Sequence, residues 1–128
     1  DTTLNAGFSN AKPWLPANDN YTTVNVAVQD KDNSSVLNYF RKMQRLRKEN
    51  EVLVYGKFNL VDPNNSDVFA YTRELNGKKL LVLLNFSKSI ASVTTGIDIS
   101  KAKVLINNYS AASSNGTLKP FEAIVFEL

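Results

Sequence analysis

The side chains that could carry chemistry in this chain are few in kind. It holds 12 Asp and Glu residues and 15 Lys and Arg residues, but no histidine and no cysteine. The commonest general base near neutral pH and the commonest zinc ligand are therefore missing. Thiolate nucleophiles, thiolate metal sites and disulfides are excluded as well. Any chemistry would have to rest on carboxylates, Lys, Tyr, Ser or Thr.

The carboxylates form no recognisable catalytic pair. Cleavage of a glycosidic bond needs two carboxylates that face each other about 5 to 9.5 Å apart. Most acidic residues of the chain fall in expected turns or at strand ends. The full set is Asp1, Asp19, Asp30, Asp32, Glu49, Glu51, Asp62, Asp67, Glu74, Asp98, Glu122 and Glu127. The five glycines are scattered and form no phosphate-binding loop. We therefore predict no catalytic, cofactor-binding or metal-ligating residue in this chain, and no cofactor.

Two further groups of residues could contact a ligand. Residues 62–67 (Asp-Pro-Asn-Asn-Ser-Asp) are rich in oxygen ligands, but they lack the glycine and the distal glutamate of a calcium loop. A hairpin turn is the favoured interpretation. Phe8, Trp14 and Tyr21 could stack on a sugar ring or serve as packing anchors, and packing anchors are favoured.

Positive charge is concentrated in one short segment, which holds Arg41, Lys42, Arg45, Arg47 and Lys48. Such a cluster is typical either of a nucleic-acid surface or of the solvated face of an amphipathic helix. The helical interpretation is favoured, because no aromatic residues for stacking on bases are interleaved with these charges. We expect no nucleic-acid partner.

These charges belong to a predicted helix that Asn33 or Ser34 caps and that runs to about Glu49. At 100° per residue, one half of the helix is apolar. That half holds Val36, Leu37, Tyr39, Phe40, Met43 and Leu46. Arg47 points into it, which indicates either a buried ion pair or a side chain that reaches past the core to solvent. The sequence does not separate these alternatives.

The segment before the helix, residues 1 to about 32, is predicted to be an irregular, loop-like arm rich in Pro, Asn and Asp. It nevertheless carries many large apolar side chains. We expect it to need another surface to pack against, and to expose apolar groups when it lacks one.

From residue 51 the period changes from 3.6 to about 2, which predicts antiparallel strands. Asn76-Gly77 is the strongest hairpin signal, and the apolar residues after it indicate a central strand covered on both faces. The predicted strands are 52–55 leading through Gly56 to 58–61, then 68–73, 79–86, 91–95, 104–107 and 123–128. Strands at this spacing indicate a β-sandwich or barrel, and the predicted fold class is mainly β. No apolar run is long enough to span a bilayer, and no signal peptide is visible.

Three stretches, taken together, carry a resemblance. Residues 5–9 (Asn-Ala-Gly-Phe-Ser), 12–18 (Lys-Pro-Trp-Leu-Pro-Ala-Asn) and Tyr21 form the first stretch. The second comprises residues 25–26, Asp32, 35–42 and 46–48, and the third comprises 54–56, 69–73, 84–87 and 118–123. In this order they resemble the α-glucosidases of glycoside hydrolase family 13, in particular oligo-1,6-glucosidases, maltases and sucrose isomerases. The resemblance covers essentially the whole chain.

The resemblance implies a C-terminal region with two parts. Residues 1–50 would be an arm and the final helix of a catalytic (β/α)₈ barrel, and residues 51–128 a C-terminal antiparallel β-sandwich domain. Members of the family carry their catalytic Asp, Glu and Asp on barrel strands, and no residue of this chain matches those motifs. A barrel of about 250 residues does not fit into this chain.

The function implied is that of a non-catalytic C-terminal part that stabilises the barrel of an α-glucosidase acting on short α-1,4 or α-1,6 glucosides. The alternatives are a carbohydrate-binding β-sandwich module, part of a sucrose isomerase, or a non-enzymatic relative. The expected partners are the catalytic barrel of the same protein and, through it, an oligosaccharide substrate. No membrane partner is expected, and the expected location is cytoplasmic.

Overall fold

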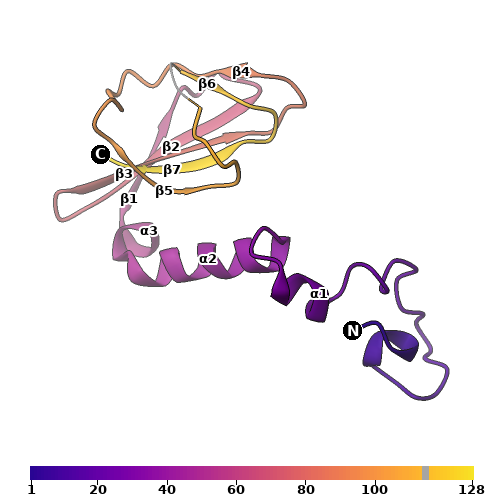
Figure 1. The fold of residues 1–128 in the computed structure, drawn as a ribbon. Helices are drawn as coiled ribbons and strands as arrows, with labels where there is room; N and C mark the ends of the chain where they lie inside the picture. Colours follow the sequence, from indigo (N-terminus) through magenta and orange to yellow (C-terminus); the bar gives the residue numbers. More distant parts are fainter. Residues whose placement is uncertain (114–115) are drawn as a thin grey trace. The chain divides into compact units, whose positions relative to one another are not determined.

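The computed structural model describes residues 1–113 and 116–128 (Figure 1). They divide into two compact units, Asp1–Gln44 and Arg45–Leu128. The helical elements are the 3₁₀ helix η1 (Leu4–Gly7) and the α-helices α1 (Val26–Lys31), α2 (Val36–Glu49) and α3 (Glu51–Tyr55). The strands are β1 (Lys57–Val61), β2 (Val68–Leu75), β3 (Lys78–Asn85), β4 (Ala91–Ser92), β5 (Lys103–Asn107), β6 (Thr117–Leu118) and β7 (Ala123–Glu127).

The second unit is built on a five-stranded sheet. Its strand order is β1-β2-β3-β7-β5, and every neighbouring pair is antiparallel. The short strands β4 and β6 form a second, two-stranded sheet. The mainly β fold predicted from the sequence is confirmed.

The hydrophobic core lies between these two sheets. Alternate residues of the large sheet supply one side of the core, and β4, β6 and the residues next to them supply the other. The buried cluster comprises Val68, Ala70, Leu81, Leu83, Ala91, Val93, Leu118, Ile124 and Phe126. Strand β3 is buried on both faces from Leu80 to Leu83, as its unbroken apolar run predicted.

The turns follow the residues that the sequence places in them. Asn76 and Gly77 have φ of 50° and 80°, so both central positions of the β2–β3 hairpin are left-handed, as a type I′ turn requires. The amide of Asn65 donates to the carbonyl of Asp62 at 3.2 Å and closes the turn between β1 and β2. The hairpin interpretation of residues 62–67 is thus confirmed.

The first unit has little hydrophobic interior. Of residues 1–44, all of which the structure describes, only Asn25 and Ser35 are buried, and both are polar. The unit is shaped by hydrogen bonds instead. The Asn25 side chain accepts from the amide of Val28 at 3.0 Å and caps α1, and Ser35 Oγ accepts from the amide of Asn38 at 3.2 Å.

Three sequence-based expectations were wrong in detail. Residues 52–55 form a helix, α3, where a strand was expected. The arm predicted as loop contains η1 and α1. The expected cap at Asn33 or Ser34 is displaced, because Ser35 precedes α2 and binds its first turn. The helix ends at Glu49, as predicted.

No helix in the described part of the chain has both the length and the apolar character that a membrane span requires.

Candidate functional site

Several acidic residues form hydrogen bonds or ion pairs with other groups of the chain. Among the described residues, no group of three or more His, Cys, Asp or Glu could hold a metal ion. Asp30 forms an ion pair with Arg41, and Glu127 with Lys78 at 2.8 Å. The prediction that the chain holds no catalytic, cofactor-binding or metal residue stays a prediction.

The side-chain oxygens of the turn at residues 62–65 accept hydrogen bonds from other groups of the chain. Asp62 Oδ2 accepts from Asn65 Nδ2 at 2.8 Å and from the amide of Thr94 at 3.0 Å. These two hydrogen bonds hold the pKa of Asp62 below its ordinary value. Asn65 Oδ1 accepts from the amides of Asp67 and Val68. The oxygens that could have bound calcium therefore fasten the β1–β2 turn to the segment after β4.

Glu122 is a buried carboxylate that sequence reasoning did not single out. It is fully buried at the turn before β7, and among the described residues Asn107, Ser113 and Lys119 donate hydrogen bonds to its carboxylate. Oε1 accepts from Asn107 Nδ2 at 2.9 Å and from the amide of Ser113 at 3.0 Å. Oε2 accepts from Ser113 Oγ and from the amide of Lys119 at 2.8 Å. Burial alone would raise the pKa of Glu122, but these bonds outweigh burial and lower it.

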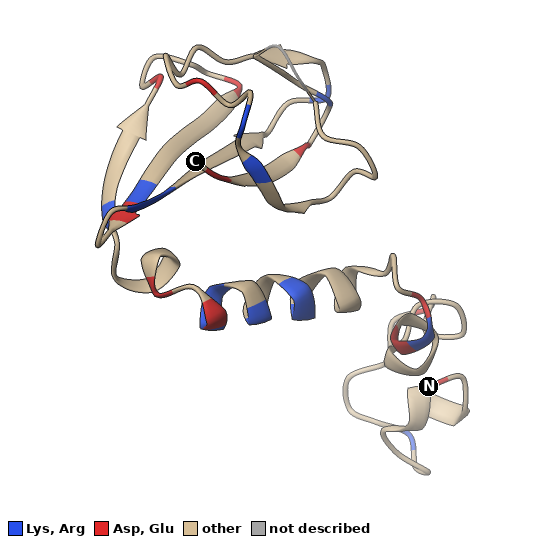
Figure 2. Cartoon of the chain, turned by 60° about the vertical axis from the view of Figure 1, so that its left-hand side comes forward, with Lys and Arg blue, Asp and Glu red and all other residues tan. Residues whose placement is uncertain are grey.

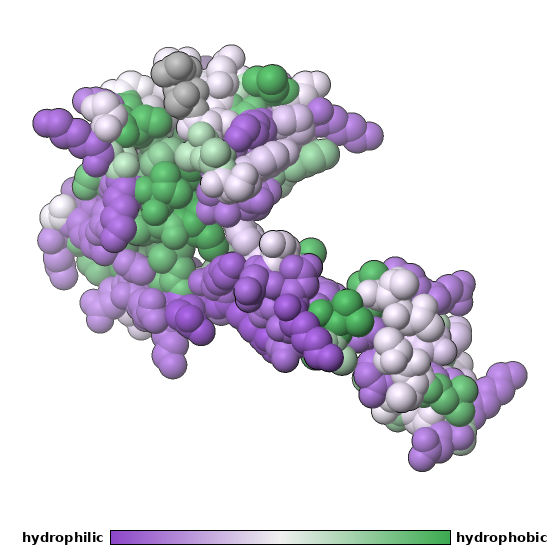
Figure 3. All heavy atoms as spheres, viewed as in Figure 1, coloured by the Kyte–Doolittle hydropathy of each residue, from purple (hydrophilic) through white to green (hydrophobic). Residues whose placement is uncertain are grey.

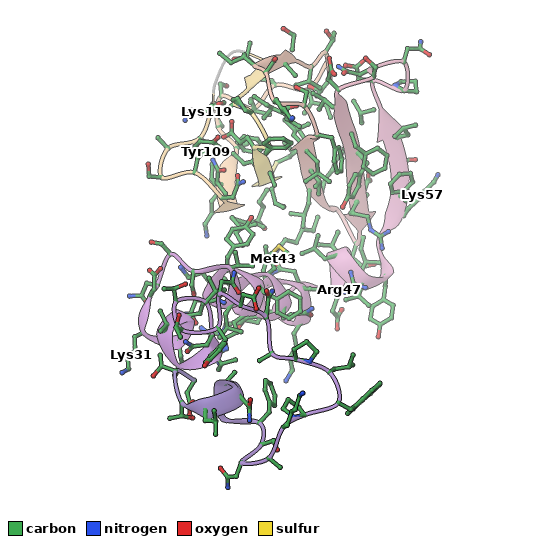
Figure 4. The ribbon with its side chains drawn as sticks, turned by 90° about the vertical axis from the view of Figure 1, so that its right-hand side faces the viewer. Lys31, Met43, Arg47, Lys57, Tyr109 and Lys119 are labelled. Atoms are coloured by element: carbon green, nitrogen blue, oxygen red, sulfur yellow. The ribbon has the colours of Figure 1, made fainter. Side chains whose placement is uncertain are left out.

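The neighbourhood of Glu122 is tied together further. Tyr109 Oη donates to the carbonyl of Pro120 at 2.8 Å, and Lys119 Nζ donates to that of Ala111 at 2.8 Å. Lys119 Nζ also lies 5.0 Å from the centroid of the Tyr109 ring, and Figure 4 shows the two side chains side by side. Both carboxylate oxygens of Glu122 accept hydrogen bonds from donors of the chain itself. This carboxylate therefore links the β5–β6 loop to the turn before β7.

Arg47 is exposed, as expected for a side chain that reaches past the core to solvent, and it forms a local hydrogen bond. Its Nη1 donates to the carbonyl of Leu53 at 2.8 Å, in the last turn of α3. Arg73, from β2, donates to the carbonyls of Val52 and Val54 at 3.4 and 3.0 Å. The last carbonyls of a helix lack intrahelical partners and carry partial negative charge. Two guanidinium groups therefore cap the C-terminal end of α3.

Two residues of the basic cluster of α2 also contact neighbouring groups of the chain. Arg41 pairs with Asp30, and Lys42 Nζ donates to the carbonyl of Asn33 at 3.1 Å. Lys and Arg residues recur along α2, as Figure 2 shows. These contacts favour the interpretation of the cluster as a solvated helix face with local partners.

An aromatic cluster lies on the face of the large sheet opposite to the core. The ring centroids of Phe58 and Tyr71 are 5.1 Å apart, those of Phe69 and Tyr71 5.3 Å, and those of Phe58 and Phe69 6.4 Å. Arg47, Leu53, Arg73 and Leu84 complete a groove of about 300 Å³ around the three rings. Burial raises the pKa of Tyr71, and the charges of Arg73 and Arg47 oppose this rise. The sequence-based site prediction did not include this cluster.

The three aromatic residues that the sequence did single out lie in the first unit. Trp14 and Phe8 are 91% and 89% exposed, and Tyr21 is half-buried. The loop that carries Phe8 is shaped by Asn5, whose Nδ2 donates to the carbonyls of Ser9 and Ala11 at 2.8 and 3.0 Å. Neither Trp14 nor Phe8 is anchored against a core within this unit, so the surface they would pack on is not among residues 1–44.

Two family profiles match this chain. Residues 1–56 match the alpha-amylase catalytic domain, and residues 68–125 match the C-terminal domain of the alpha-amylase SusG. Among relatives, an oligo-1,6-glucosidase of Bacillus cereus is 41% identical over the whole chain, and a trehalose-6-phosphate hydrolase of Bacillus subtilis is 33% identical. This chain spans 24% of the length of each of these relatives.

Solved structures give the same result. A trehalulose synthase from Pseudomonas mesoacidophila MX-45 is 35% identical over 99% of this chain, with a TM-score of 0.88. An isomaltulose synthase from Klebsiella sp. LX3 is 34% identical over 99% of the chain, also with a TM-score of 0.88. This chain covers 24% of either structure.

Proposed function

Since this chain belongs to the α-glucosidase group of glycoside hydrolase family 13, as a segment about a quarter as long as its relatives, we propose that it is a non-catalytic C-terminal part that stabilises the catalytic barrel. The parent protein would hydrolyse short α-1,4 or α-1,6 glucosides. Residues 1–50 would supply an arm and the final helix of the barrel, and residues 51–128 the C-terminal β-domain. No residue of the chain is assigned a catalytic role.

One observation carries this proposal: residues 1–44 bury only two polar residues yet expose several large apolar ones. Trp14, Val36, Phe40 and Met43 lie on this unit with 42% or more of their surface exposed. A segment without its own hydrophobic core gains little from folding by itself, because burial of apolar surface is the main driving force of folding. The exposure of its apolar side chains is explained if they complete the interior of a larger domain. The match of residues 1–56 to a catalytic domain supports this explanation.

The test uses the parent protein, with and without residues 57–128. We expect the full-length parent to turn over p-nitrophenyl α-glucoside, and this chain alone to be inactive. Removal of residues 57–128 should lower the melting temperature of the barrel, with activity lost on mild heating. Turnover by the purified chain alone, or a barrel whose melting temperature does not depend on residues 57–128, would contradict the proposal.

A second candidate activity for the parent is the isomerisation of sucrose. It is favoured by the similarity to a trehalulose synthase and an isomaltulose synthase. Incubating the parent protein with sucrose and separating the products decides between the two: glucose and fructose indicate hydrolysis, and an isomeric disaccharide indicates isomerisation.

A further inference from the structure

The β2–β3 hairpin turns on an asparagine that is followed by a glycine. Asparagine is a chemically labile residue, because the main-chain nitrogen of the next residue can attack its carboxamide carbon. Glycine has no Cβ and leaves that nitrogen unhindered. Asparagine precedes glycine twice in the sequence, at Asn76-Gly77 and at Asn115-Gly116, and Asn115 lies outside the described residues. The structure therefore bears on the first pair.

The side chain of Asn76 is not held in place. Asn76 and Gly77 are both exposed, and no side-chain hydrogen bond among the described residues involves Asn76. By contrast, Asn65 and Asn85 donate to main-chain carbonyls through Nδ2. A Cβ added to Gly77 would meet no atom within 4 Å. Water therefore reaches both reacting groups, and no side-chain contact in the described part of the chain has to break before they meet.

The turn conformation is the remaining constraint. Asn76 and Gly77 have φ of 50° and 80°, and the reaction requires Asn76 to leave this conformation. Figure 1 shows the tip of the β2–β3 hairpin at the edge of its unit, and hydrophilic residues gather at that edge in Figure 3. The first buried residue of β3 is Leu80, beyond the tip. Opening of an exposed tip costs far less free energy than opening of the core, so the folded chain samples the open tip.

We propose that Asn76 is a site of spontaneous deamidation in the folded protein, with water as the co-reactant. The nitrogen of Gly77 forms a bond to Cγ of Asn76 and loses its proton, and the carboxamide nitrogen leaves as ammonia. Water then opens the resulting cyclic imide. Opening at Cγ gives aspartate, whereas opening at the main-chain carbonyl gives isoaspartate, whose main chain runs through the former side chain. This inference does not depend on the proposed function.

Either product places a new carboxylate beside an existing polar network. Asn76 lines a pocket of about 470 Å³ together with Asn50, between α2 and α3, and Lys78 of β3. Lys78 Nζ donates to Asn50 Oδ1 at 2.9 Å and pairs with Glu127 at 2.8 Å. A carboxylate at position 76 competes for Lys78. Isoaspartate also lengthens the main chain of the turn, which disturbs the pairing of Leu75 with Lys78.

The test follows the purified 128-residue chain during storage in mildly alkaline buffer, with peptide mass spectrometry after trypsin digestion. Residues 74–78 form one tryptic peptide, in which Asn76 is the only residue with a carboxamide. Residues 58–73 form the control peptide, which carries Asn59, Asn64 and Asn65 without a following glycine. We expect peptide 74–78 to gain a carboxylate at least ~10-fold faster than peptide 58–73, in both the aspartate and the isoaspartate forms. Equal rates in the two peptides would overturn the inference.

Storage of the urea-unfolded chain tests whether the folded state reacts. If peptide 74–78 is modified in the unfolded chain but stays intact in the folded one, the turn protects Asn76 and the inference is wrong.

Asn76→Asp is the matched variant for the effect on the fold. It carries the new charge on an unaltered main chain, and Asp-Gly also suits this type of turn. We expect the stored wild type, once rich in isoaspartate, to melt below Asn76→Asp. A stored wild type that melts no lower than this variant would refute the disturbed pairing of Leu75 with Lys78.

Discussion

At the scale of single residues, Glu122 is the clearest case of a side chain that the fold depends on. In the described part of the chain, its carboxylate accepts hydrogen bonds from Asn107, Ser113 and Lys119, on segments that are separated along the chain. A buried carboxylate is tolerated only when such donors replace water. Glu122 therefore fixes the geometry of the turn that leads into β7, the strand that pairs with both β3 and β5.

Replacing Glu122 by Gln should destabilise the chain although the shape is retained. The new amide group would point a donor at the Ser113 and Lys119 donors, leaving buried polar groups without acceptors. We expect a loss of about 1–3 kcal/mol in the free energy of unfolding, measured by urea denaturation. Glu74→Gln, at an exposed position of β2, is the control and should change it by less than about 0.5 kcal/mol.

The lowered pKa of Glu122 also predicts how stability depends on pH. Its hydrogen bonds favour the charged form, so the folded pKa lies below the ordinary value of 4.5. The stabilisation is then fully present above pH 4.5 and is lost as the pH falls through the folded pKa. Wild type should lose more stability than Glu122→Gln between pH 6 and pH 3 in the same urea titration. Parallel losses in the two proteins would show that other carboxylates, such as Asp62, cause the acid sensitivity.

At the scale of elements, α3 depends on close contact with its surroundings. Gly56 follows the helix, and a Cβ added there would lie 2.4 Å from the carbonyl oxygen of Val52 and 3.1 Å from the amide of Glu74. Both neighbours are backbone atoms, which cannot turn away as a flexible side chain can.

Gly56→Ala should therefore shift α3 away from the sheet. We expect the free energy of unfolding to fall by about 1–3 kcal/mol, the usual cost of overpacking, together with faster amide exchange in residues 51–55. Ser66→Ala, a change of similar size in an exposed turn, serves as the control. An unchanged stability in Gly56→Ala would mean that α3 is not held against β2 as described.

The elements that the sequence predicted correctly are those specified by local signals. The β2–β3 hairpin follows from Asn76-Gly77, and β3 from an apolar run too long and too uniform for an edge strand. Helix α3 was missed because four apolar residues, 52–55, have the composition of a buried strand, and periodicity cannot separate the two over so short a run. Carbonyls of α3 accept hydrogen bonds from Arg47 and Arg73, and Arg73 comes from a strand about twenty residues further on.

The interaction sites show the same limit. Glu122 was not singled out, because its donors converge only in the folded chain. The aromatic cluster requires the register of β1 on β2, which brings Phe58 next to Tyr71. The available signal was that large apolar residues stand on both faces of the expected strands 58–61 and 68–73. The residues of the outer face are as apolar as those of the core face.

At the scale of the whole molecule, the two units differ in what stabilises them. The unit Arg45–Leu128 contains a sheet with a buried cluster of nine hydrophobic residues. The unit Asp1–Gln44 contains polar ties, such as Ser35 Oγ to the carbonyl of Gln29 at 2.7 Å and Asn38 Nδ2 to the same carbonyl at 2.9 Å. Hydrogen bonds that can exchange with water contribute only about 0.5–1.5 kcal/mol each.

Hydrogen exchange on the isolated chain should therefore divide it into two classes. We expect amides of β2, β3 and β7 to be protected at least ~1,000-fold, because they open only when the core opens. Amides in residues 1–44 should exchange with little protection, since no apolar core has to be disrupted to expose them.

In the parent protein the same residues should become protected, because their apolar side chains would be covered by the rest of the catalytic domain. The strands β2, β3 and β7 act as the internal control. Strong protection of residues 1–44 in the isolated chain would mean that they fold without the remaining domain, and would remove the main support for their place in the barrel.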